Sequence, residues 1–324
     1  MTETDGEPAA VPAALQASIL AWFDRTGRDL PFRVTADPFA ILVSEAMAQQ
    51  TQAARAGEAW IGFMETYPTA AALASASPAD VLRAWRGLGY NRRAVNLWRA
   101  ARQIVEVHGG EVPADLAALE ALPGVGRYTA RAVAALAFGM PVGAVDTNVR
   151  RVLGRIVAGV AGDTGAIGSA ELQRIADAAV PGDRAGAWTH ALMDLGATLC
   201  GPRTPDCARC PARPWCRFAA GMRRPGERTA SVVVDAHRST ATARTAAKPF
   251  VETSRWLRGR IVDRLRASAG EDWTIIEGPI GVHDHAAVVA ALEGLARDGM
   301  IELDGASTGP GEPTPGRGAR LAIS

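Results

Sequence analysis

The sequence predicts a mainly α-helical protein with a small α+β module at its C-terminal end. From residue 12 to about 218, apolar residues recur at helical spacing between short turns marked by proline and glycine. Alternating runs of Val, Ile and Thr, which are typical of strands, are scarce in this part. Beyond residue 250 two more helical stretches precede a candidate β-hairpin, and this order favours a winged-helix-like module.

The helices of the first part follow one another in chain order, each bounded by turn residues. We expect them at 16–23, 39–64, 78–85, 93–109, 113–122 and 129–138, with further helices up to about 218.

The chain after residue 218 divides into a linker and a module. Residues 219–250 mix Arg, Thr, Ala and Pro without periodicity, which is typical of a linker. In 251–324, Leu257, Ile261 and Leu265 share one helical face, a second helix ends at Gly299, and the stretches MIELD and ARLAIS form the hairpin. We expect this module to have its own core and to fold independently.

The composition indicates a soluble protein that binds a polyanion through local patches. The 324 residues carry a net charge of only +1 and contain no apolar run of the roughly 18 to 20 residues that cross a membrane. The N-terminus is acidic and does not resemble a secretion signal, so we expect a cytoplasmic protein. Six arginines without an acid lie in 83–102, and six with one aspartate in 203–224.

The stretch LPGVGRYTA (122–130) predicts two helices joined by a tight glycine hairpin. Gly124 and Gly126 leave the backbone N–H groups at the second helix uncovered, and Arg127 adds positive charge. This arrangement fits a helix-hairpin-helix clamp on a nucleic-acid backbone. Taken alone, the same turn also fits an ordinary corner between helices.

All four cysteines lie in one segment with the spacing C-x6-C-x2-C-x5-C, at Cys200, Cys207, Cys210 and Cys216. In a cytoplasmic chain such a group favours metal ligation over disulfides. Zinc sites usually pair two close Cys-x2-Cys units, and only one exists here. The spacing therefore favours a structural [4Fe–4S] cluster, with zinc as the alternative.

The hairpin, the segment GAVDTNVRRVLGR (143–155) and the cysteine loop together resemble the helix-hairpin-helix superfamily of base-excision DNA glycosylases, over roughly 12–218. Within it, RDLPFR, SEAMAQQTQ and WRGLGYNRRA look like the MutY-type adenine DNA glycosylases, which remove adenine mispaired with 8-oxoguanine or guanine. The resemblance implies a six-helix barrel at about 28–140 and a cluster domain built from 12–27 and 141–218. It also implies that the active site lies between the two domains.

Breaking an N-glycosidic bond calls for one carboxyl group that protonates the base and a second that stabilises the sugar cation. Glu45 lies on the helical face of Ile41 and Leu42, an apolar setting that raises the pKa of a carboxyl group, and we assign it as general acid. The alternative is an ordinary solvated glutamate. The resemblance implies the second role for Asp146, which also fits a helix N-cap.

Tyr128 occupies the position at which the lyase branch of the superfamily has a Schiff-base lysine. Since residues 1–247 contain no lysine, the resemblance implies hydrolysis by water. Tyr128 then acts near the sugar, with packing against the hairpin as its alternative.

The resemblance also assigns residues that bind the extruded base and residues that fill the gap it leaves in the duplex. Gln50 and Tyr90 match the family's wedge positions, although Tyr90 also fits a place in the core at a helix end. Arg28 and Arg33 match positions that line the adenine pocket, with structural pairing to Asp29 or Asp37 as the alternative for either. His190 stands where a base-contacting Glu or Gln is usual, and Phe32, Ala48 and Thr147 also depart from the family pattern.

The sequence thus predicts a monomeric adenine glycosylase acting on double-stranded DNA with A:8-oxoguanine or A:G mismatches. A thymine mismatch glycosylase of the same fold and a non-catalytic iron–sulfur DNA-binding module are the alternatives. The family's Nudix-like C-terminal domain is not recognisable in 251–324, so that module is either a lesion reader or a general contact with DNA or protein.

Overall fold

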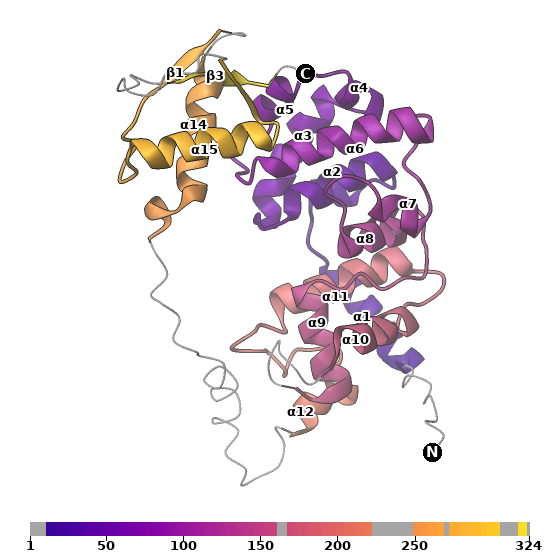
Figure 1. Ribbon diagram of the computed structural model, residues 1–324. Coiled ribbons are helices and arrows are strands. Elements are labelled where there is room, and N and C mark those ends of the chain that lie inside the picture. The colour runs from indigo at the N-terminus through magenta and orange to yellow at the C-terminus, as the bar shows by residue number, and fades with distance from the viewer. Residues whose placement is uncertain (1–10, 161–166, 222–248, 269–271, 305–316, 323–324) are drawn as a thin grey trace, which may run out of the picture.

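A computed structural model describes residues 11–160, 167–221, 249–268, 272–304 and 317–322. Their helices form two layers, and the C-terminal module lies beside the first, far from α12 (Arg217–Gly221) (Figure 1). Two separate hydrophobic cores define the layers: one holds α2 to α8 and the other holds α1 with α9 to α12. We call the first layer the barrel domain and the second the cluster domain. The mainly helical fold class is confirmed.

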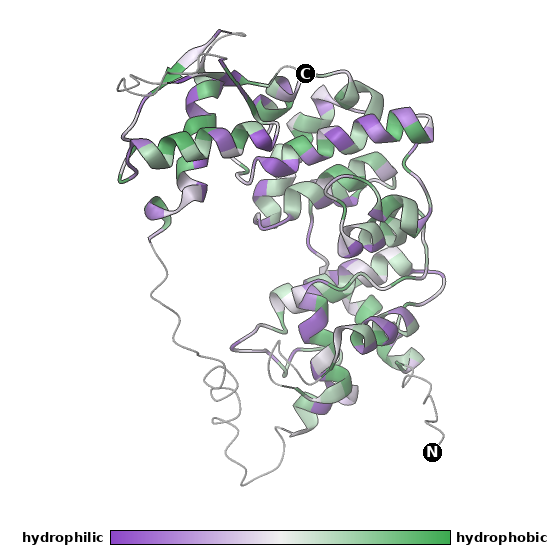
Figure 2. Cartoon of the chain, viewed as in Figure 1, coloured by the Kyte–Doolittle hydropathy of each residue, from purple (hydrophilic) through white to green (hydrophobic). Residues whose placement is uncertain are grey.

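The barrel domain is built around α2, which is buried at every position from Phe39 to Glu45 and again at Met47. Pro38 starts this helix, and the Asp37 side chain accepts a hydrogen bond from the Phe39 N–H as its N-cap. On the surface, α6 shows alternating hydrophobic and hydrophilic bands, as an amphipathic helix does (Figure 2). The helices of this domain are α2 (Pro38–Ala48), α3 (Ala53–Thr66), α4 (Ala70–Ala74), α5 (Pro78–Ala84), α6 (Arg92–His108), α7 (Leu116–Glu120) and α8 (Arg127–Ala137).

The continuous helix predicted over 39–64 is wrong, because the chain breaks between α2 and α3. Gln50 takes a left-handed conformation with φ 54°, which ends the helix. The Arg93 guanidinium donates hydrogen bonds to the carbonyl oxygens of Ala46, Met47 and Gln49. These carbonyls therefore find partners without a continuing helix.

The cluster domain contains the N-terminal helix, as predicted. Helix α1 packs against α11, and α11 also contacts α8 of the barrel domain. A single turn of π-helix at Gly154–Ala158 follows α9. The helices of this domain are α1 (Ala13–Thr26), α9 (Thr147–Leu153), α10 (Ser169–Ala178), α11 (Ala185–Thr198) and α12. The predicted linker largely lies outside the described residues, although its first residues belong to α12.

The C-terminal module has the predicted helices and hairpin, with one further strand. Antiparallel pairing joins β2 to β3, with Ile301 opposite Leu321. The strand β1, which the sequence analysis missed, is three residues long and pairs with β3, so the sheet order is β1-β3-β2. The elements are α14 (Ser254–Ala267), β1 (Thr274–Ile276), α15 (His285–Arg297), β2 (Ile301–Leu303) and β3 (Arg317–Leu321).

The module packs directly on the barrel domain. The buried side chains of Leu257, Ile261 and Leu265 belong to the same hydrophobic core as α2 and α6. Arg266 is buried at this junction, where its Nε donates to the Leu82 carbonyl and its Nη2 to the Asn91 side chain, each at 2.8 Å. The module is therefore not the separate unit that the sequence predicts, because its core continues into that of the body.

Candidate active site

The three predicted catalytic side chains meet where the two domains face one another. Glu45 comes from the third turn of α2, Tyr128 from the first turn of α8, and Asp146 from the residue before α9. Helix α2 packs against α8, and α11 contacts both α8 and α9. Tyr128 and Asp146 both influence the ionisation of Glu45, so the three groups form one electrostatic unit.

Glu45 is buried, with 8% of its surface exposed. Burial raises the pKa of its carboxyl group to about 7, and the negative charge of Asp146 adds to the rise. The Tyr128 hydroxyl and the Arg33 guanidinium act in the opposite direction. The predicted apolar setting is confirmed, and the carboxyl group retains a proton near neutral pH.

Tyr128 is enclosed by the same groups. Burial and the neighbouring Glu45 raise the pKa of its phenol well above the ordinary value, so the hydroxyl is neutral. The hydroxyl lies 4.0 Å from the Met193 sulfur on α11, which places the ring between α8 and the cluster domain.

Asp146 is the N-cap of α9, as one reading of the sequence predicts. One carboxylate oxygen accepts from the Val149 N–H at 2.7 Å, and the other accepts from the Asn148 side chain at 3.0 Å. The cap holds the carboxylate in one orientation. Because Asp146 is only half-buried, it remains open to a further ligand.

Arg28 and Arg33 converge on a carboxylate that the sequence analysis missed. Asp194 of α11 is 1% exposed and accepts hydrogen bonds from both guanidinium groups at 2.7 to 2.8 Å. The alternative of a structural pairing is correct in kind, but the partner is Asp194 and not Asp29 or Asp37. Since Asp194 lies more than 160 residues away in sequence, only its position four residues after His190, on the same helical face, could have drawn attention to it.

His190 lies beside this group of charges. Burial and the positive charge of Arg33 lower the pKa of its imidazole to about 3, so the ring is neutral. The ring stacks near Phe23, and its Nδ1 is buried with no hydrogen-bond partner among the described residues. A buried nitrogen of this kind can accept from or donate to a bound base.

The glycine hairpin leaves the N-terminus of α8 open. Gly124 takes a left-handed conformation with φ 80°, as expected, whereas Gly126 is the extended N-cap of α8 with φ −93°. A side chain at Gly126 would meet nothing within 4 Å, and Arg127 beside it is exposed. The uncapped N–H groups of the first turn therefore face open space, as an anion site requires.

The two predicted wedge residues share an unusual backbone. Gln50 and Tyr90, with φ 54° and 46°, are the non-glycine residues in the described ranges that take positive φ. Arg93 joins their loops, because it also donates to the carbonyls of Leu88 and Gly89. Such strain is maintained only where the surroundings enforce it, and it is common at functional sites.

The four cysteines line one small cavity between α9 and α12. Burial raises the pKa of the Cys207, Cys210 and Cys216 thiols, that of Cys210 to about 12. Among the described residues, no three His, Cys, Asp or Glu side chains lie close enough to hold a single metal ion.

Two arginines that the sequence analysis did not single out support the cysteine loop. Arg155 lies 3.2 Å from the Cys200 sulfur and donates to the Gly201 carbonyl at 2.7 Å, while Arg151 donates to the Cys200 carbonyl at 2.8 Å. The four arginines within the loop are all exposed: Arg203, Arg209, Arg213 and Arg217. Buried arginines thus hold the loop and exposed ones surround it.

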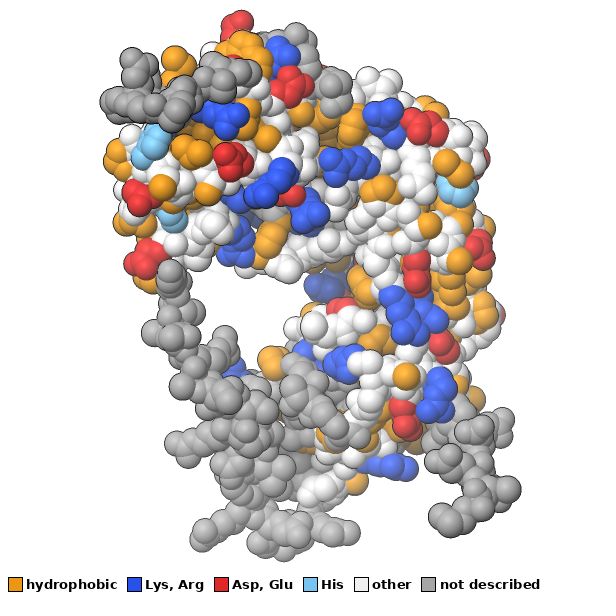
Figure 3. Space-filling model, viewed as in Figure 1, with side chains coloured by type: hydrophobic (Ala, Val, Ile, Leu, Met, Phe, Trp, Pro, Cys, Tyr) orange, Lys and Arg blue, Asp and Glu red, His pale blue; other side chains and the backbone are white. Residues whose placement is uncertain are grey.

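Positive charge gathers on one face of the molecule. Figure 3 shows arginine side chains along the hollowed face of the helical body and at its junction with the C-terminal module. None of the described helices is sufficiently long and apolar to span a membrane.

Comparison with known proteins identifies the family. Residues 43–172 match the model of the HhH-GPD superfamily of base excision DNA repair proteins. The chain is 41% identical over 302 residues to the adenine DNA glycosylase of Mycobacterium tuberculosis, covering 91% of this chain and 93% of that protein. It is 43% identical over 213 residues to the adenine DNA glycosylase of Homo sapiens, covering 63% of this chain and 39% of that protein.

The fold agrees with a solved structure of the same superfamily. A thermostable thymine-DNA glycosylase superposes with a TM-score of 0.58 at 30% identity, covering 64% of this chain and 95% of that one. The chain therefore belongs to the HhH-GPD superfamily of base excision DNA repair proteins, and within it to the adenine DNA glycosylases.

Proposed function

We propose that this adenine DNA glycosylase of base excision repair is monofunctional and removes adenine mispaired with 8-oxoguanine or guanine in double-stranded DNA. The observation that carries this proposal is the buried Glu45, whose pKa of about 7 provides a proton donor beside Asp146 and Tyr128. The two matched relatives are named adenine DNA glycosylases, and the sequence motifs predict the same activity for this chain.

Each of the three side chains has one task. Glu45 donates its proton to the adenine ring as the bond to the sugar breaks, so the base leaves in neutral form. Asp146, oriented by the N–H of Val149, stabilises the positive charge that develops on the sugar. The neutral hydroxyl of Tyr128 lies beside both carboxyl groups and positions the sugar and the attacking water.

Hydrolysis follows from the absence of a nearby amine in the sequence. Residues 1–247 contain no lysine, so the helical body has no side-chain amine that could form a Schiff base with the sugar. The enzyme would release free adenine and leave the strand intact at an abasic site.

The surrounding residues extrude the base and hold it. Gln50 and Tyr90 enter the gap in the duplex, while the N–H groups after Gly126, with Gly124 and Arg127, hold the backbone of the damaged strand. His190 presents an unpaired ring nitrogen to the purine. Arg28 and Arg33 act through Asp194 as positioning residues for the pocket wall, because their guanidinium groups are already bound there.

The cysteine loop fits a [4Fe–4S] cluster. Cys200, Cys207, Cys210 and Cys216 would hold it as thiolates, and Arg155 beside Cys200 would offset part of their negative charge. Zinc sites usually join two Cys-x2-Cys units, whereas this loop has one, and this spacing favours the cluster. The cluster would order the loop that carries the exposed arginines and would take no part in the reaction.

The test is a set of otherwise identical duplexes containing A:8-oxoguanine, A:G, A:C or T:G, assayed for base release under single-turnover conditions. We expect release of adenine from the first two and no protein–DNA adduct when borohydride is present. Glu45→Gln should bind these duplexes with unchanged affinity and lose about 10²- to 10⁴-fold in rate. The exposed Glu58→Gln serves as the matched control and should behave as wild type.

Three results would contradict the proposal. Preferential release of thymine from T:G would favour the thymine mismatch enzyme, whose solved relative shares the fold of the body. DNA binding without release of any base would favour a non-catalytic module. Efficient trapping by borohydride would require an amine nucleophile.

A further inference from the structure

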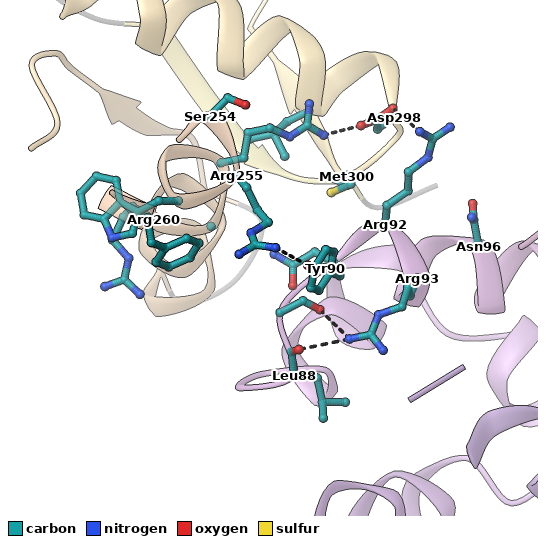
Figure 4. A pocket seen from close by; sticks show the side chains of 17 residues that line it. Leu88, Tyr90, Arg92, Arg93, Asn96, Ser254, Arg255, Arg260, Asp298 and Met300 are labelled. Carbon is teal, nitrogen blue, oxygen red and sulfur yellow. Dashed lines mark hydrogen bonds and ion pairs between the residues drawn. The ribbon is translucent and has the colours of Figure 1, made fainter. Parts of the chain in front are cut away.

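A groove at the junction of the barrel domain and the C-terminal module lies outside the catalytic cleft. It has a volume of about 710 Å³ and runs between residues 88–96 of the barrel domain and helix α14 of the C-terminal module. Figure 4 shows Tyr90, Arg92 and Arg93 on one wall and Arg255 and Arg260 on the other.

The groove is strongly basic. Five of its lining residues are arginines, and its one carboxylate is Asp298. Arg258 forms an ion pair with Asp298, and Arg92 lies 4.0 Å from the same carboxylate. Arg260 forms an ion pair with Asp263 of its own helix at 2.6 Å. The side chains of Arg92 and Arg260 nevertheless remain 68% and 54% exposed, so both guanidinium groups can reach a ligand. Exposed arginines that outnumber the nearby acids are what phosphate groups require.

The groove begins at the wedge. The Arg255 guanidinium contacts the Tyr90 hydroxyl and lies 4.8 Å from the centre of the Tyr90 ring, while Arg93 lies 5.5 Å from that centre. Arg266 fixes the module to Asn91, the residue after Tyr90. The module therefore holds its arginines at a set position next to the tyrosine that enters the duplex.

The order of the side chains shows which strand reaches the groove. Glu45 and Gln50 lie along one segment of α2 and its following turn, and Arg93 connects that turn to the loop of Tyr90. Tyr90 itself lines the groove, which therefore adjoins the wedge. A residue that fills the gap left by the extruded adenine lies against the base that loses its partner, so the groove next to Tyr90 is adjacent to the intact strand.

We propose that this groove binds the sugar–phosphate backbone of the strand opposite the adenine, at the phosphates next to the base that loses its partner. The inference rests on the proposed function, because it uses the wedge to order the two strands. Arg92 and Arg260 supply the phosphate contacts, and the aromatic rings of Phe250 and Trp256 close the module side of the groove. The module is then one half of the grip on the intact strand.

The experiment measures binding in the Glu45→Gln background, so that the substrate stays whole. We compare it with the same protein carrying Arg92→Gln and Arg260→Gln. The matched control removes two exposed arginines elsewhere, with Arg25→Gln on α1 and Arg174→Gln on α10. The groove variant should bind an A:8-oxoguanine duplex about tenfold more weakly, and its slope of log Kd against log salt should fall by about 1.8. The control should change neither quantity appreciably.

The strand is identified with duplexes in which single phosphates are replaced by neutral methylphosphonates. Replacement next to the base opposite adenine should weaken binding by the parent protein about fivefold and should weaken the groove variant no further. The proposal would be overturned if the methylphosphonate and the groove substitutions weakened binding additively, or if only phosphates of the adenine strand affected binding. Unchanged DNA binding by the groove variant would also overturn it. The last result would leave the groove to a different partner.

Failure of the groove proposal can be distinguished from failure of the proposed function. Excision by the wild-type protein is measured on the same duplexes in parallel. Normal excision of adenine without the expected phosphate pattern would overturn the groove alone. Failure to excise adenine would overturn the function, whatever the phosphate map shows.

Discussion

Glu45 links the rate of the reaction to pH. Burial raises the pKa of its carboxyl group to about 7, and only the protonated form can donate to adenine. We expect the single-turnover rate to be level below pH 7 and to fall about tenfold per pH unit well above it. Rates measured from pH 5 to 9 test this, and a rate that stays level to pH 9 would exclude Glu45 as general acid.

The same group makes stability depend on pH, with a sign that follows from the raised pKa. The folded protein retains the Glu45 proton up to about pH 7, whereas the ordinary value for the side chain is 4.5. The free energy of unfolding from this group is therefore greatest below pH 4.5 and declines as pH rises from 4.5 to 7. Denaturation with urea at several pH values should show that Glu45→Gln removes this part of the dependence.

The two roles of Asp146 can be separated by one substitution. Asparagine caps a helix about as well as aspartate, so Asp146→Asn should keep the hydrogen bond to Val149 and the stability of the fold. It removes the negative charge, and we expect the excision rate to fall about 10²- to 10³-fold. Single-turnover rates and thermal melting measure the two effects. Asp37→Asn, at the N-cap of α2, is the matched control and should change neither. An active Asp146→Asn enzyme would leave only the capping role.

The individual site residues differ in how far local sequence could reveal them. Glu45, Tyr128 and Asp146 lie in short motifs, so their neighbourhood could be predicted. The partner of Arg28 and Arg33 could not, because Asp194 approaches them only through the packing of α1 against α11. Arg93 looked like part of a basic surface, yet its guanidinium binds six oxygen atoms from two loops.

Among the elements, the cysteine loop leads to a prediction about the colour of the purified protein. The purified protein should be yellow-brown and contain about four iron and four sulfide per chain, as a [4Fe–4S] cluster requires. Cys210→Ser should lose the colour and destabilise the cluster domain, since Cys210 lies in the cavity that α9 and α12 share. Iron, sulfide and zinc analysis with circular dichroism tests both points. A colourless, active preparation with one zinc per chain would show that the cluster assignment is wrong.

Long elements could be predicted, and short or interrupted ones could not. The pattern of apolar residues indicated α1, α6 and α14 because each is long and buries one face. The break after α2 was hidden, because its residues favour helix and the cause is a side chain more than 40 residues away. The strand β1 escaped notice since only Ile276 of its three residues is buried.

At the scale of the whole molecule, the C-terminal module is both a structural partner of the barrel domain and part of the proposed DNA surface. Deletion of residues 222–324 should expose the apolar surface under α14 and leave the Leu82 carbonyl without Arg266. We expect a lower melting temperature and equally slower excision of adenine opposite 8-oxoguanine and opposite guanine. Single-turnover rates on both substrates measure this.

A second variant keeps that comparison interpretable. Arg266→Met retains much of the buried volume and removes only the hydrogen bonds to Leu82 and Asn91. It should show the same pattern in a milder form. A loss confined to the 8-oxoguanine substrate in either variant would instead make the module a reader of the oxidised base.

The left-handed conformations of Gln50 and Tyr90 have a consequence for protein engineering. Glycine adopts positive φ without steric cost, so a search for thermostable variants would tend to accept glycine at both positions. Such a variant would resist heat better and yet lose the side chains that we propose enter the duplex. Directed evolution of this enzyme should therefore select for turnover in every round, because melting temperature alone would reward the removal of its wedge.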